Sequence, residues 1–242
     1  SLKLTFFSIF GIKYFLAIVI FGWNRVKPKT HFFATIMMAL GTHFSAIWIV
    51  VANSWMQTPA GFHIVGEGVK ARAEITDFWA MVFNPSSMVR LQHVIIGCWL
   101  AGAFLVISVA AYYLLKKKHL KFAQKSMTIS LWVAFISTIL QLFVGDKSGK
   151  IVAKYQPAKL AALEGPYDES AAADMYLFGW VDQEKQEVTG LAIPGGLSFL
   201  LDQDFEAPVT GLNAFPEDER PSQVNAVFQF YHLMVAIGMF LI

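Results

Sequence analysis

The chain has 242 residues, of which 56% are hydrophobic and 15% charged, and its mean hydropathy is +0.51. This composition argues against an ordinary soluble domain and favours a protein that crosses the bilayer several times. A formal net charge of +2 and the lack of a nucleic-acid-binding motif predict no nucleic-acid partner. The single cysteine, Cys98, excludes an internal disulfide framework and a metal site built from clustered cysteines.

Five apolar segments are predicted to be membrane helices, and each complete one is close to the roughly 20 residues that span a bilayer. They run approximately over residues 4–21, 32–55, 88–115 and 127–144, and from residue 224 to the last residue, 242. The predicted fold class is therefore all-α, a multi-span membrane helix bundle with a polar extracytoplasmic loop.

Short basic loops without acidic residues follow the first and third predicted helices. Such loops lie on the cytoplasmic side by the positive-inside rule, so residues 56–86 and 146–221 are expected outside. We therefore expect four helices in residues 1–145, an extracytoplasmic loop in 146–221 and a fifth helix in 222–242. That last helix is still apolar at Ile242, so we expect it to be truncated.

The loop over residues 146–221 holds most of the 17 acidic residues of the chain, and its opening predicts local order. Pro157 suits the first turn of a short helix, the segment KLAALE continues it, and Gly165 suits its C-terminal cap. Lys159 and Glu164 are five residues apart, about 140° around a helix, so they would not form an ordinary surface ion pair. They could instead face different parts of a bound ligand.

Three histidines, His43, His93 and His232, fall within predicted membrane segments. A polar side chain there is either a ligand or a residue packed against other helices, and one sequence leaves both interpretations open. Counting from the outer face at about 1.5 Å per residue, His93 lies roughly 8 Å deep and Met234 roughly 15 Å deep. A His/Met pair at similar depth could hold one low-spin haem, although methionine more often fills a core.

Several long motifs resemble subunit I of the cytochrome bd quinol oxidases, which are bacterial respiratory terminal oxidases. The resemblance starts near Leu16 and covers the rest of the chain, with the motifs in the order of the family. They are FGWNR at 21–25, SAIWIVVANSWMQTPAGF at 45–62, NPSSMVRLQHVIIG at 84–97, GDKSG at 145–149, KLAALE at 159–164, FGWVDQE at 178–184, GLNAFPEDERP at 211–221 and YHLMVAIG at 231–238.

This resemblance implies that His93 and Met234 are the axial ligands of a low-spin b haem. It also implies that Lys159 and Glu164 act on quinol in a short form of the quinol-binding loop. His232 stands near the haem at a position where the family often has an arginine thought to stabilise the reduced haem. The family further implies a high-spin b haem and a haem d in the complete subunit, a subunit II partner, and a place in the bacterial cytoplasmic (inner) membrane.

One departure keeps a second function open. The positions near Leu4 and Ile12, where the family carries glutamates for the high-spin haem and proton delivery, are apolar, and residues 1–14 do not resemble the family. The alternative is a divergent b-type haem protein that oxidises quinol without reducing oxygen. A transporter or scaffold is a third possibility and predicts no haem absorbance. For the oxidase, residues 1–242 by themselves are expected to be incomplete and unable to reduce oxygen.

Overall fold

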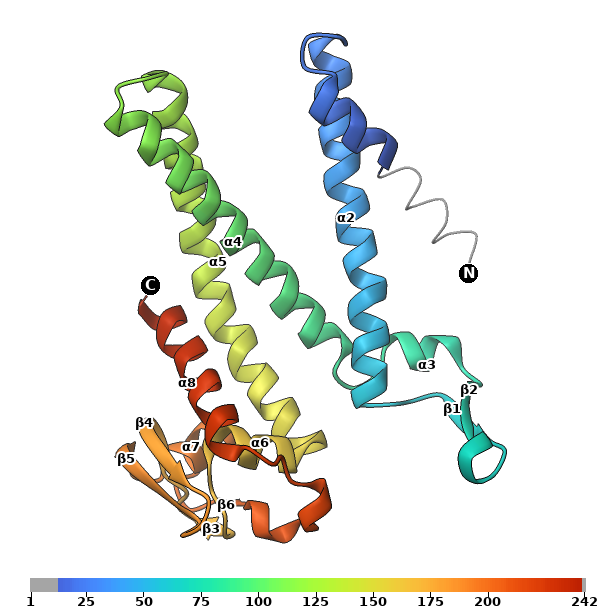
Figure 1. The fold of residues 1–242 in the computed structure, drawn as a ribbon, viewed down its shortest axis with the longest axis vertical. Helices are drawn as coiled ribbons and strands as arrows, with labels where there is room; N and C mark the ends of the chain where they lie inside the picture. Colours follow the sequence, from blue (N-terminus) through green and yellow to red (C-terminus); the bar gives the residue numbers. More distant parts are fainter. Residues whose placement is uncertain (1–12, 241–242) are drawn as a thin grey trace. The chain divides into compact units, whose positions relative to one another are not determined.

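The computed structural model of the protein describes residues 13–240, which form two units divided between Ile95 and Ile96. Within these described residues, three long helices are apolar enough to cross a membrane: α2 (Pro28–Gln57), α4 (Ser87–Leu115) and α5 (Leu120–Tyr155) (Figure 1). The predicted second and third helices are confirmed to within a few residues. Residues 13–21 are also helical, whereas Leu4 and Ile12 lie outside the described residues.

In the first unit, a buried polar cluster closes the connection between α2 and the start of α4. This connection holds the hairpin β1 (Phe62–Val65) and β2 (Arg72–Ile75), with η1 (Gly68–Lys70) between the strands, and then α3 (Phe78–Val82). The Thr58 hydroxyl lies 3.0 Å from Asn84 Oδ1 and 2.6 Å from Ser86 Oγ. The buried hydroxyls of Thr58 and Ser86 thus have protein partners in place of water.

Polar residues near the end of α2 also join it to α4 within the first unit. Arg90 of α4 donates to Asn53 Oδ1 at 3.0 Å and to Gln57 Oε1. Gln57 in turn donates to Asn53 at 3.2 Å. Asn53 is therefore a polar residue of α2 that binds a side chain of the neighbouring helix α4.

Helix α5 differs from the predicted fourth helix at both ends, because it begins at Leu120 instead of Met127 and does not end at Val144. It continues through Gly145 and Gly149 to Tyr155, about three further turns. The ion pair between Asp146 and Lys150, 3.1 Å long and one turn apart, supports this extension. The helix ends only where Pro157 disfavours helical backbone at the preceding residue, Gln156 (φ −141°, ψ 57°).

The rest of the loop is a small ordered region of short elements in the second unit (Figure 1). The predicted short helix is confirmed as α6 (Pro157–Glu164), with proline in its first turn and Gly165 as a left-handed cap. The other elements, in chain order, are β3 (Ser170–Ala171), β4 (Met175–Asp182), β5 (Glu187–Ile193), α7 (Gly196–Asp202), β6 (Pro208–Val209), η2 (Leu212–Ala214), η3 (Glu217–Glu219) and α8 (Val224–Phe240). Strands β4 and β5 form an antiparallel hairpin, and β3 pairs with β6.

The first turns of α8 belong to the core of the loop. Val224 and Phe228 are buried in a cluster with Ala161 and Ala162 of α6, and with Val181 of β4. Since burial of apolar area is the main force that holds such a region together, α8 is part of the loop fold as well as a predicted membrane helix.

A row of polar side chains on α8 binds the edge of β4 that does not pair with β5. Asn225 Oδ1 accepts from Val181 N at 3.0 Å, Gln229 Nε2 donates to Gly179 O at 2.6 Å, and His232 Nε2 lies 2.8 Å from Tyr176 O. A register shift between Tyr176 and Phe178 accompanies this last contact. The three side chains take the place of a third strand and satisfy an otherwise open edge.

Replacing Gln229 with alanine should loosen this edge. The substitution removes the hydrogen bonds to Gly179 O and, at 3.3 Å, to Asn225 Oδ1. We expect a loss of about 1–2 kcal/mol of local stability, measured as faster amide exchange in β4. Gln183→Ala is the matched control, because Gln183 makes one exposed bond to Ser222 O. Equal exchange rates in the two variants would contradict the role given to Gln229.

Candidate functional site

Glu164, the last residue of α6, is the buried carboxylate of the loop. Only 5% of its surface is exposed. The Tyr231 hydroxyl of α8 donates a hydrogen bond to its carboxylate, and His232 of the same helix acts on it electrostatically. Burial raises the pKa of Glu164, and the charge of His232 and the bond from Tyr231 oppose that rise. A carboxylate with a raised pKa is suited to accept a proton near neutral pH.

The cap of α6 fixes where Glu164 points. Gly165 has φ +91°, a conformation that favours glycine, and a Cβ there would stand 2.7 Å from Val188 Cγ2. The same Cβ would lie 3.3 Å from the ring of Phe228. The end of α6 is therefore held tightly against β5 and α8, and Glu164 faces α8.

His232 is fixed on both sides of its ring. Its Nδ1 lies 2.9 Å from Phe228 O and its Nε2 2.8 Å from Tyr176 O. The ring stacks on Phe228 with centroids 3.8 Å apart. Both ring nitrogens therefore face backbone carbonyl oxygens, and the tautomer decides which nitrogen donates.

Lys159 lies elsewhere on α6 and does not share the surroundings of Glu164. Its side chain is exposed, whereas Glu164 is buried. This difference agrees with the 140° separation expected from their spacing. The structure therefore groups Glu164 with Tyr231 and His232, whereas Lys159 is exposed.

The two predicted haem ligands, His93 and Met234, lie on the apolar helices α4 and α8. His93 lies in the second turn of α4, in the first unit, with a partly buried side chain. Met234 lies on α8 in the second unit, with 57% of its surface exposed. Imidazole and thioether together form a donor set that suits a low-spin haem iron, and the exposed thioether is not confined in a packed core.

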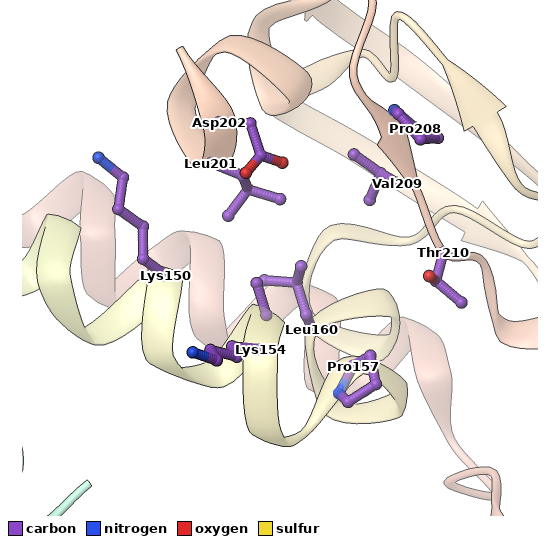
Figure 2. A pocket seen from close by; sticks show the side chains of 10 residues that line it. Lys150, Lys154, Pro157, Leu160, Leu201, Asp202, Pro208, Val209 and Thr210 are labelled. Carbon is purple, nitrogen blue, oxygen red and sulfur yellow. The ribbon is translucent and has the colours of Figure 1, made fainter. Parts of the chain in front are cut away.

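A pocket of about 450 Å³ opens beside the first turn of α6 (Figure 2). Figure 2 shows Lys150 and Lys154 of α5 on one side of the pocket, Leu160 of α6 close to Lys154, and Asp202 of α7 above them in the view. Neither Lys159 nor Glu164 lines this pocket. Because Glu164 is the last residue of α6, it lies at the opposite end of the helix, about 10 Å along its axis.

Comparison with known proteins shows which family this chain resembles. The family model described as cytochrome bd terminal oxidase subunit I matches residues 5–242, so the similarity begins earlier in the chain than the expected start near Leu16. Cytochrome bd-II ubiquinol oxidase subunit 1 of Escherichia coli is 34% identical over 86% of this chain and 40% of that protein. Cytochrome bd ubiquinol oxidase subunit 1 of Bacillus subtilis is 31% identical over 94% of this chain and 50% of that protein.

Solved structures give the same result. The structure of bd oxidase from Geobacillus thermodenitrificans matches with a TM-score of 0.80 and 36% identity. The match covers 97% of this chain and 53% of that one. The chain thus spans about half the length of the relatives it matches.

Proposed function

Because the chain belongs to the family of cytochrome bd terminal oxidase subunit I, we propose that it is the quinol-oxidising, haem-binding part of such a subunit. The observation that carries this proposal is the buried Glu164 on the motif KLAALE, held by Tyr231 and facing His232. The whole enzyme would pass electrons from membrane quinol towards an oxygen-reducing di-haem site.

Glu164 acts in this proposal as the proton acceptor. A quinol hydroxyl gives its proton to the carboxylate as the quinol loses electrons, and the proton then leaves to the outer aqueous side. Burial raises the pKa of Glu164 towards neutral pH. A carboxylate with such a pKa can both accept the quinol proton and release it afterwards. Lys159, exposed on the same helix, holds a quinol oxygen or steers the loop.

His93 and Met234 would hold a low-spin b haem, with His232 close to it in the position where the family often has arginine. Bound there, the haem would supply a one-electron acceptor of raised potential. We further propose a high-spin b haem and haem d in the complete subunit, subunit II as partner, and the bacterial cytoplasmic membrane as location. Residues 146–221 would then be extracytoplasmic.

A second function, quinol oxidation without oxygen reduction, is favoured by one feature of the sequence. The first 66 residues contain no Asp or Glu, so the positions near Leu4 and Ile12 lack the carboxylates of the family. In the hydrocarbon core a proton route needs ionisable or hydrogen-bonding side chains. Quinol-driven haem reduction in the complete membrane assembly without oxygen uptake would identify this second function.

Glu164→Gln tests the leading proposal. The amide keeps the size of the side chain but cannot accept the proton, so quinol oxidation in the complete assembly should slow by about a hundredfold. The low-spin haem spectrum should stay unchanged. Glu169→Gln is the matched control, because Glu169 is an exposed residue of the same loop. Loss of the haem spectrum in the Glu164 variant would instead indicate a structural role for this carboxylate.

A further inference from the structure

The bond between Tyr231 and Glu164 joins two segments that are distant in sequence, the end of the short helix α6 and the third turn of α8. Helices α6 and α8 are packed together through Ala161, Ala162, Val224 and Phe228. Glu164 is buried at the end of this contact, where bulk water cannot solvate its charge. The ionised carboxylate therefore depends on the groups that the protein places around it.

Among the described residues, the groups that act on Glu164 come from α8. They are the Tyr231 hydroxyl, which donates to the carboxylate, and His232, which acts through its charge. The ring nitrogens of His232 already lie against Phe228 O and Tyr176 O. The side-chain donor left for the carboxylate is therefore the Tyr231 hydroxyl. Lys159, the other charged residue of α6, is exposed on a different side.

We infer that Tyr231 is a positioning residue for quinol oxidation, whose hydroxyl orients the Glu164 carboxylate and stabilises its ionised, proton-accepting form. This inference rests on the proposed function, because it assigns Tyr231 a task only if Glu164 receives the proton of the quinol. The hydroxyl remains a donor throughout: it gives a hydrogen bond to the carboxylate and does not itself lose its proton.

The direction of the pH effect follows from the balance of forces on Glu164. Burial raises the pKa of Glu164, and the Tyr231 hydrogen bond lowers it. Removing the hydroxyl leaves burial less opposed, so the pKa of Glu164 rises further. More Glu164 is then protonated at a given pH and cannot accept a proton. The acidic limb of the quinol-oxidation profile should consequently move to higher pH.

Tyr231→Phe in the complete membrane assembly tests this inference. We expect the acidic limb to move up by about one pH unit, the contribution typical of a hydrogen bond to a charged group. Infrared difference spectra contain a carboxyl band that Glu164→Gln should remove. The pH at which this band titrates should rise by the same amount in Tyr231→Phe. Tyr155→Phe is the matched control, since Tyr155 is exposed at the end of α5 and its hydroxyl makes no part of this cluster.

A second substitution keeps the test independent of any loss of packing. Site-specific incorporation of difluorotyrosine at position 231 strengthens the hydroxyl as a donor with little change in size, and should move both readouts to lower pH. An unchanged pH profile and carboxyl band in both variants would overturn the inference while Glu164→Gln still slowed the reaction. If Glu164→Gln had no effect, the proposed function itself would fail.

Discussion

Replacing Met234 with leucine should remove the low-spin b haem signal from the reduced-minus-oxidised spectrum of the complete assembly and stop quinol-driven reduction. Leucine has a similar volume and hydrophobicity but no sulfur to bind iron. The exposed position of Met234 on α8 means that the substitution creates no cavity in the core of the loop. The expected effect is therefore loss of the iron ligand with the loop left folded. His93→Ala should have the same spectral result, because it removes the other proposed ligand.

Met239→Leu is the control for this experiment. Met239 lies further along α8 and is exposed to nearly the same extent, 58% against 57%. Its replacement should leave the spectrum intact. A low-spin signal of normal intensity in Met234→Leu would exclude Met234 as an axial ligand, and some other residue would then have to be identified.

Phe228→Ala should destabilise the loop by about 3–5 kcal/mol, the usual cost of truncating a fully buried aromatic residue. The ring of Phe228 is 0% exposed and stacks on His232. It also lies in the space beside Gly165 and Gly179, where a Cβ would come within 3.3 and 3.5 Å of it. Its removal leaves a cavity under α6 and β4 together. Limited proteolysis of the loop on heating would measure the change.

The neighbouring Phe230 supplies a control of the same residue type, because 74% of its surface is exposed. Phe230→Ala should change the proteolysis midpoint much less. Equal midpoints for the two variants would mean that the loop does not depend on Phe228 for its packing. A lowered midpoint in Phe228→Ala would reflect the lost packing of the loop. Slower quinol oxidation in the same variant would follow from movement of Glu164, because Phe228 packs beside Gly165 at the end of α6.

The long helices could be predicted because hydropathy over about 20 residues is a strong signal. The short helix α6 could also be predicted, since Pro157 and Gly165 mark its two ends by local backbone chemistry. The predicted end of the fourth helix, at Val144, was wrong because Gly145 and the charged residues after it resemble a helix stop. Glycine costs a helix only about 1 kcal/mol, and the Asp146–Lys150 pair partly offsets that cost.

The candidate site was less accessible to sequence reasoning. The spacing of Lys159 and Glu164 was enough to predict that they would not form an i,i+4 pair, and that the two residues face one bound ligand stays a prediction. The contact between Glu164 and Tyr231 had no local signal, because it depends on how α8 packs against α6 and β4. The hairpin of β4 and β5 was also missed. Gly179 and Gly190 stand opposite each other in it, and a Cβ at Gly190 would collide with Phe178 O.

The continuation of α5 beyond Val144 has a consequence for the evolution of the loop. A helix transmits rotation rigidly, so one residue inserted between Gly145 and Tyr155 would turn α6 by about 100° and raise it by about 1.5 Å. Glu164 would then leave its place beside α8. An insertion in the turn between β4 and β5 would have no such effect. Length variation among related chains should therefore collect in the hairpin turn and avoid the segment between Gly145 and Tyr155.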